Sequence, residues 1–187
     1  ESQLEGALSL LGELLKNREQ SADLSLIGGG ALLLIGAIER PTKDLDVVAL
    51  VDDGELRTAE PFPEFLARAV TEVASALELP SDWLNPGPPD LLRFGLPEGC
   101  LQRTIVRSYG GLTIRLASLQ DQIFFKLYAA VDQGPRSRHF ADLQLLKPAP
   151  GQLLAAARWC RSHDPSDGFR LMWVQALAAL GLETADV

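Results

Sequence analysis

The chain has 187 residues, of which 17 are basic and 25 acidic, giving a formal net charge of -8. Hydrophobic residues make up 47% of the sequence and charged residues 22%, a balance that is typical of globular proteins and argues against intrinsic disorder. The length is enough for one well-buried core, or for a core with a small helical extension. The net negative charge argues against a general nucleic-acid binder.

Cysteine and histidine are sparse and scattered. Cys100 and Cys160 lie far apart and form no Cys-x-x-Cys pair, and neither His139 nor His163 clusters with them. This pattern argues against a zinc site and a disulfide scaffold, and it favours a reducing cytoplasm. The longest apolar run, 24–38, is interrupted by glycines and is shorter than the roughly 20 residues that cross a bilayer. We therefore expect a cytoplasmic location and no membrane partner.

Four elements are expected in the first quarter of the chain. An amphipathic helix is predicted over 4–15, where leucines recur at helical spacing. A short apolar strand, 24–27, stops at three glycines, and the helix-forming residues after them predict a helix from the glycines to Ile38. A second strand, 44–50, opens with two carboxylates.

The glycines and the strand after them carry the chemical signal. Gly28, Gly29 and Gly30 lie where a helix begins, and the first N–H groups of a helix have no partner inside it. Because glycine lacks a Cβ, a phosphate can approach these groups, so the turn could bind an anion. Asp44 and Asp46 lie two residues apart in a predicted strand, so both point to one face, where they could hold a divalent metal.

Each half of this pattern also has an ordinary structural explanation. Glycine-rich turns between a strand and a helix are common, and two aspartates could form the polar face of an edge strand. Their order favours a function, because an Asp-x-Asp strand follows the glycine turn after one helix. Other glycine motifs fit less well, since a P-loop needs Gly-Lys-Ser/Thr after its last glycine and a dinucleotide-binding turn needs a third glycine where Leu33 stands.

The middle of the chain predicts packing elements. Apolar residues at helical period predict a long helix over 62–77, and the proline-rich stretch 80–97 predicts an irregular connection with one or two short helical turns. Two runs, 102–107 and 112–116, joined by Tyr-Gly-Gly, predict a hairpin. The chain would then contain at least four strands.

The last third is predicted to be helical. The first of its helices, 119–131, is apolar nearly all round except for Lys126, whose ammonium either extends to the surface or meets an anion. Asp142 lies on the next helix, and its position alone predicts a surface carboxylate paired with Arg138 at helical spacing. Two further helices follow, separated by a turn and cap at 164–166.

Charge is distributed unevenly along the chain. Residues 1–92 hold 17 acidic and 6 basic residues, whereas 93–170 hold 11 basic and 6 acidic ones. A basic second half beside a carboxylate site suits a phosphate-rich substrate, including RNA. Each arginine taken alone is explained more simply as part of a solvated helix face.

The segment Ile27-Gly28-Gly29, followed after one helix by Arg40-Pro41-Thr42-Lys43-Asp44-Leu45-Asp46, resembles the signature of the nucleotidyltransferase superfamily with the DNA polymerase beta-like fold. With a later helix that carries Lys126, it is similar to small bacterial proteins related to AbiE-type abortive-infection toxins. The resemblance covers about 24–146. It implies an α+β fold: a small mixed sheet flanked by helices over 1–117, with a helical C-terminal part, 118–187, packed on this core.

The resemblance also implies an activity. The expected enzyme depends on Mg²⁺ or Mn²⁺ and transfers a nucleoside monophosphate from an NTP to a hydroxyl of an RNA, such as tRNA, or of a protein. Such an enzyme could be the toxin of a toxin–antitoxin pair, with an antitoxin protein as its partner. The alternative is a catalytically idle module that keeps the fold and binds a nucleotide or a protein partner.

The resemblance assigns roles residue by residue. Asp44 and Asp46 would be catalytic metal ligands, and Lys126 and Asp142 would join the catalytic set. The nucleotide would be bound by Gly28, Gly29, Gly30, Arg40, Thr42 and Lys126. Arg40 and Thr42 either contact phosphate or position the carboxylates.

One departure from the superfamily pattern bears on activity. Many superfamily enzymes carry a third carboxylate on a later strand, yet the predicted strands 102–107 and 112–116 contain no Asp or Glu, and Arg115 stands where one is expected. Either Asp142 substitutes for it, as the toxin-like relatives suggest, or catalysis is impaired.

Overall fold

A computed structural model describes residues 2–182. The chain divides into two compact units, residues 1–118 and 119–187, and each is described by itself. The protein has a mixed six-stranded sheet together with helices, which confirms the α+β class expected from the sequence. Within residues 2–182, no helix has both the length and the apolar character needed to span a bilayer.

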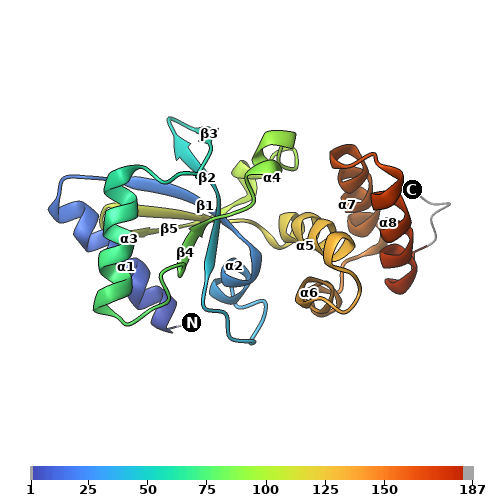
Figure 1. The fold of residues 1–187 in the computed structure, drawn as a ribbon, viewed down its shortest axis with the longest axis horizontal. Helices are drawn as coiled ribbons and strands as arrows, with labels where there is room; N and C mark the ends of the chain where they lie inside the picture. Colours follow the sequence, from blue (N-terminus) through green and yellow to red (C-terminus); the bar gives the residue numbers. More distant parts are fainter. Residues whose placement is uncertain (1, 183–187) are drawn as a thin grey trace. The chain divides into compact units, whose positions relative to one another are not determined.

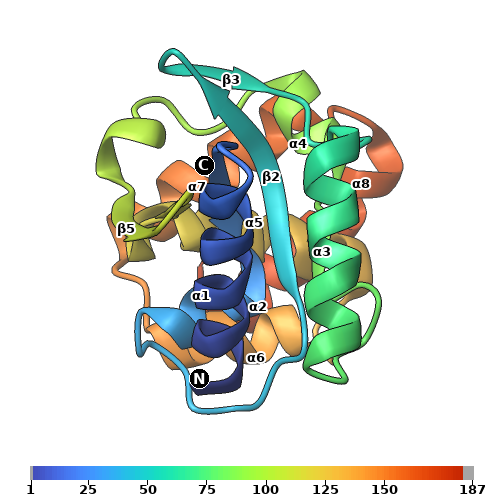
Figure 2. The ribbon, with the colours of Figure 1, turned by 90° about the vertical axis from the view of Figure 1, so that its left-hand side faces the viewer.

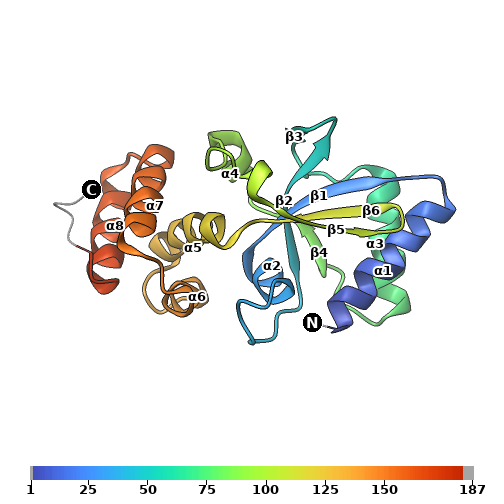
Figure 3. The same ribbon diagram turned by 180° about the vertical axis from the view of Figure 1, so that it is seen from behind.

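The first unit is built on the sheet (Figure 1). Its strands run in the order β3-β2-β1-β6-β5, and β4 pairs with β2 off this path. The pairs β1–β6 and β2–β4 are parallel, whereas β1–β2, β2–β3 and β5–β6 are antiparallel. The predicted hairpin is confirmed as β5 and β6, drawn beside β1 in Figure 3. The strand bounds are β1 Ala22–Ile27, β2 Leu45–Asp52, β3 Glu55–Arg57, β4 Leu84–Pro86, β5 Ile105–Tyr109 and β6 Leu112–Leu116.

Four helices belong to the first unit: α1 Ser2–Asn17, α2 Gly28–Leu34, α3 Glu64–Ala76 and α4 Pro89–Phe94. The helices α1 and α3 contact each other and lie side by side (Figure 2). The leucines that predicted α1 are all buried, as an amphipathic helix requires. A short 3-10 turn, Leu101–Arg103, precedes β5.

Three local features differ from the sequence prediction. The helix after the glycines ends at Leu34 rather than Ile38, because the chain leaves the helix through Gly36, whose φ is +73°. β3 replaces part of a predicted loop, and β4 lies in the stretch predicted to be an irregular connection. Both are three-residue strands, too short to produce a period-2 pattern.

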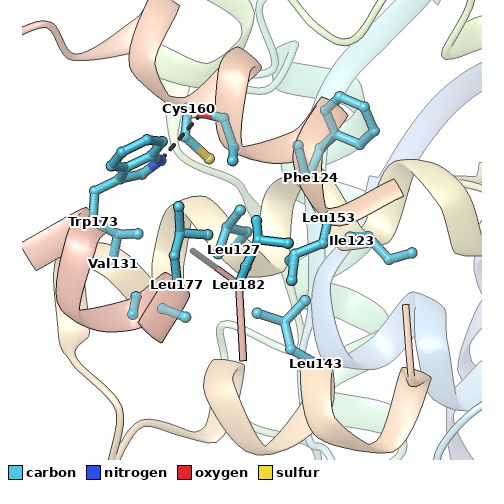
Figure 4. Packing of buried hydrophobic residues seen from close by; sticks show 14 of the residues in the cluster. Ile123, Phe124, Leu127, Val131, Leu143, Leu153, Cys160, Trp173, Leu177 and Leu182 are labelled. Atoms are coloured by element: carbon cyan, nitrogen blue, oxygen red, sulfur yellow. Dashed lines mark hydrogen bonds between the residues drawn. The ribbon is translucent and has the colours of Figure 1, made fainter. Parts of the chain in front are cut away.

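The second unit is a group of four helices: α5 Leu119–Gln133, α6 Arg138–Leu146, α7 Pro150–His163 and α8 Asp167–Ala179. The helix α5 contacts each of the other three. Its residues Leu127 and Val131 pack with Leu143, Leu153 and others in a buried apolar cluster (Figure 4). At one side of that cluster, the buried Trp173 donates from Nε1 to the Ala157 carbonyl at 3.2 Å. Ser166 accepts from the Phe169 N–H at 3.2 Å, which confirms the predicted cap.

Candidate functional site

The glycine turn lies beside one of the two candidate carboxylates. In the antiparallel pair of β1 and β2, Ile27 lies opposite Asp46, and α2 begins at the next residue, Gly28. Gly28 has a φ of +82°, a conformation that residues with a Cβ rarely adopt. A Cβ placed on Gly28 would lie 2.5 Å from Asp46 Oδ2. The absence of a side chain at Gly28 is therefore what lets the Asp46 carboxylate approach the start of α2.

The next two glycines also pack against the segment that carries the aspartates. A Cβ on Gly29 would lie 2.9 Å from Nη2 of Arg40, and one on Gly30 would meet the backbone carbonyl of Asp44. The three glycines thus pack closely against Arg40, Asp44, Leu45 and Asp46. Close packing alone accounts for glycine at these positions, and the same packing brings Arg40 and Asp46 to the start of α2.

Thr42 fixes the other carboxylate. Its Oγ1 donates to Asp44 Oδ1 at 2.7 Å. Asp44 lies one residue before β2, and Asp46 is the second residue of that strand. Both side chains are partly exposed, whereas the intervening Leu45 is fully buried. This alternation places the two carboxylates on the same face of the strand.

The donor set on this face fits a magnesium ion that arrives with a substrate. Mg²⁺ is usually held by one or two carboxylates together with substrate phosphates and water. Asp44 and Asp46 would be the protein ligands, since Thr42 occupies only one oxygen of Asp44. Among the described residues, no group of three or more Asp, Glu, His or Cys side chains is arranged to hold a metal. Asp44 and Asp46 are the two carboxylates that this face offers to a cation.

Asn85 is a neighbour of Asp46 that the sequence analysis did not identify. It lies on β4, and in the parallel pair of β2 and β4 it is the residue in register with Asp46. Its Nδ2 donates to the carbonyls of Leu45 at 3.3 Å and Asp82 at 3.2 Å. The only sequence signal was a short apolar-polar-proline run, Leu84 to Pro86, inside a proline-rich stretch.

Arg115 takes part in a different interaction of the same sheet. It lies on β6, in register with Ser25 of β1. Its guanidinium donates to both carboxylate oxygens of Asp23, from Nε at 2.8 Å and from Nη2 at 2.7 Å. The hydrogen bond to Asp23 raises the pKa of Arg115 above its ordinary value. Arg115 is thus half of a bidentate ion pair that links β6 to β1.

Lys126 and Asp142 lie in the second unit and pair with each other. Lys126 Nζ lies 2.6 Å from Asp142 Oδ2, and the two side chains are 2% and 0% exposed. The Lys126 ammonium therefore meets an anion rather than extending to the surface, which were the two alternatives left open by the sequence analysis. The prediction of a surface carboxylate at Asp142 is wrong, because α5 and α6 pack together and bury it. The nucleotide-binding and catalytic roles of this pair remain predictions.

A cavity of about 550 Å³ opens next to the segment that carries Asp44. Leu4 of α1 and Leu33 of α2 give it apolar surface, and Pro41, Thr42 and Pro80 border it. Thr42 thus faces this cavity and also holds Asp44. Its volume is within the range of small-molecule sites.

A scan against models of protein families matches none of them, and searches of curated proteins and of solved structures find no significant match. The nucleotidyltransferase resemblance therefore stays a prediction from the sequence, made from Ile27 to Gly29, Arg40 to Asp46 and Lys126.

Proposed function

We propose that this protein is a Mg²⁺-dependent nucleotidyltransferase, which transfers a nucleoside monophosphate from an NTP to a hydroxyl of an RNA, with tRNA as one candidate, or of a protein. The observation that carries the proposal is the contact of the Asp46 carboxylate with Gly28 at the start of α2. The proposal extends to a toxin that an antitoxin protein neutralises in the cytoplasm, as in the toxin-like relatives that the sequence resembles.

The arrangement of the first unit supports the proposal in two ways. Asp44 and Asp46 share one strand face, and Thr42 fixes the first of them. The Arg40 guanidinium lies against Gly29, close to both the glycine turn and the Asp-x-Asp segment. A cation and two carboxylates next to one glycine turn suit a ligand that carries both phosphate and a divalent metal.

In this reaction, the residues of the site would mainly hold the reacting groups in position. The acceptor hydroxyl oxygen forms a bond to the α-phosphorus of the NTP, the bond from that phosphorus to the bridging oxygen breaks, and pyrophosphate leaves while the hydroxyl proton passes to solvent. A bound Mg²⁺ would neutralise charge on the phosphates. Asp44 and Asp46 would hold the ion in place, and Arg40 would pair with a phosphate oxygen, so that the reacting groups are held in line.

Transfer of label from NTP tests the proposal directly. Each of the four α-³²P-labelled NTPs is offered with Mg²⁺ to the full chain, together with cell RNA and protein. Label is expected on one of these acceptors with the wild-type chain and is expected to disappear with Asp46→Ala. Absence of transfer with all four nucleotides would contradict the proposal.

Asp52→Ala is the matched control for that experiment. Asp52 ends the same strand, β2, where it pairs with Arg57 at 3.0 Å on the surface, and both side chains are more than half exposed. Such pairs contribute little to stability, so this variant is expected to transfer label as the wild-type chain does. Equal loss of transfer in both variants would indicate a general effect of removing charge from β2.

A second candidate function is a nucleotide-binding module without turnover. It is favoured by the set of only two carboxylates and by the neutral residues in register with Asp46 on the neighbouring strands, which are Ile27 on β1 and Asn85 on β4. Calorimetry distinguishes the two candidates. Binding of Mg·NTP without release of pyrophosphate would support the module, whereas pyrophosphate release in the presence of an acceptor would support the enzyme.

A further inference from the structure

Asn85 occupies a defined position beside the candidate metal ligands. In-register residues of a parallel strand pair point to the same face of the sheet, and β4 places Asn85 in register with Asp46. The neighbour of Asp46 on the opposite side, Ile27 of β1, is apolar and buried. Asn85 is therefore the polar residue that the sheet itself brings next to Asp46.

Its hydrogen bonds fix how the amide is oriented. Nδ2 donates to two backbone carbonyls, those of Leu45 and Asp82. Because a carbonyl can only accept, these contacts identify which end of the amide is nitrogen. Both N–H groups are thus used within the chain, and no donor to Oδ1 is found among residues 2–182. The group that Asn85 can still offer to a ligand is an oxygen.

We propose that Asn85 is the third protein ligand of the metal site, binding through Oδ1 beside Asp44 and Asp46. The inference rests on the proposed function, because it assumes a divalent cation at the two carboxylates. An amide oxygen is an ordinary ligand for hard cations but brings no charge. The site then has three oxygen ligands and a charge of only -2, so it binds the free cation weakly and requires the phosphates of the NTP for tight binding.

Two substitutions at Asn85 test whether it is a metal ligand or only supports the backbone through hydrogen bonds. Asn85→Ala removes the oxygen, and Asn85→Asp adds a charged one while removing the Nδ2 donors. If Asn85 is a ligand, the alanine variant binds metal more weakly and the aspartate variant more tightly than the wild-type chain. If Asn85 only supports the backbone, both variants bind metal more weakly, because each loses the same two hydrogen bonds to Leu45 and Asp82.

The experiment measures the affinity of the full chain for Mn²⁺ alone, from the electron paramagnetic resonance signal of the free ion. We expect Asn85→Asp to increase the affinity at least about tenfold and Asn85→Ala to lower it by a similar factor, since even residues outside the ligand shell change metal affinity by about 10–100-fold. Ser81→Asp, which adds the same charge at an exposed position before β4, controls for general electrostatics. Circular dichroism confirms that each variant is folded.

Asp46→Ala, measured in parallel, distinguishes failure of the inference from failure of the proposed function. If the wild-type chain binds Mn²⁺ through Asp46 but Asn85→Asp does not bind it more tightly, the inference about Asn85 is overturned and the metal site remains. If neither the wild-type chain nor Asn85→Asp binds Mn²⁺, the inference about Asn85 is overturned, and the transfer of label from NTP then decides the proposed function. A gain with Ser81→Asp equal to that with Asn85→Asp would also overturn the inference.

Discussion

Gly28 combines two constraints that can be separated by mutation. Its φ of +82° disfavours any side chain, and a Cβ would overlap the Asp46 carboxylate. Gly36, at the other end of α2, has a similar φ of +73° but open space around it. Gly36→Ala should therefore lower the free energy of unfolding only by the cost of a left-handed backbone conformation, about 1–2 kcal/mol. Gly28→Ala should lower the free energy of unfolding by more than this and should also displace the Asp46 carboxylate.

The two glycine variants are compared by urea unfolding and by Mn²⁺ affinity. We expect both to be destabilised, and only Gly28→Ala to lose affinity for the metal. Equal metal affinity in the two variants would mean that the position of the Asp46 carboxylate does not matter for the site. Loss of affinity in Gly36→Ala would mean that α2 as a whole has been disturbed.

The buried pair of Lys126 and Asp142 gives a second prediction at the residue scale. Removing one member of a buried ion pair leaves an uncompensated charge and costs about 3–5 kcal/mol, whereas replacing both with apolar residues is often close to neutral. Lys126→Met and Asp142→Leu should each lower the free energy of unfolding by about this amount. The double variant should recover most of it, as measured by urea unfolding.

Arg138→Met is the matched control, because Arg138 is an exposed cation on α6, four residues before Asp142. Its effect should stay within about 0.5 kcal/mol. A double variant no more stable than the single ones would contradict the prediction that the pair acts as a unit. If the double variant is stable yet fails to transfer label from NTP, the role that the resemblance assigns to Lys126 and Asp142 gains support beyond stability.

At the scale of elements, the sequence predicted those with a strong period. We recognised α1 from its leucine spacing, β1 from its apolar run, and the hairpin of β5 and β6. In each case the apolar residues follow a pattern along the whole element. The strands β3 and β4 were missed. Each has three residues and is formed by pairing with β2, a long-range contact that leaves no periodic signal in the short strand itself.

The same reason explains which parts of the site could be predicted. Asp46 and the glycine turn were expected to be close, because one short helix connects two adjacent strands. The register of Asn85 with Asp46 depends on the pairing of β4 with β2. Asn85 lies 40 residues after Leu45, whose carbonyl it contacts. The pairing of Lys126 with Asp142 depends on the packing of α5 against α6. Neither contact follows from local spacing.

The edge of the sheet at β5 gives a prediction for an element. β5 pairs with β6 on one side and ends the strand order, and its residues Ile105 and Val106 are 45% and 50% exposed. Exposed apolar edge strands promote pairing with other chains, and a charge on such a strand prevents it. Ile105→Lys is therefore expected to reduce aggregation, measured as light scattering during heating below the unfolding temperature.

Ser108→Lys provides the control on the same strand. Ser108 is exposed, so this variant adds the same charge without removing an apolar side chain. A smaller effect than that of Ile105→Lys is expected. Identical scattering by the wild-type chain and Ile105→Lys would indicate that β5 does not take part in aggregation.

At the scale of the whole molecule, each compact unit contains a buried cysteine and a buried tryptophan. The first unit contains Cys100 and Trp83, whose indole donates to the Val70 carbonyl at 3.1 Å. The second contains Cys160 and Trp173. Both cysteines are buried thiols, and burial raises the pKa of the Cys160 thiol. Since the thiolate is the reactive form, labelling of each cysteine requires its own unit to open.

Thiol labelling therefore tests whether the two units open independently. Lys126→Met should increase the labelling rate of Cys160 on the order of a hundredfold, because a loss of about 3 kcal/mol in the second unit raises its open fraction by that factor. The rate of Cys100 should stay unchanged. The two rates are measured by mass spectrometry after labelling with iodoacetamide in native buffer. An equal increase at both cysteines would mean that the destabilised chain opens as one cooperative unit, and the division at residue 118 would then have no counterpart in its unfolding.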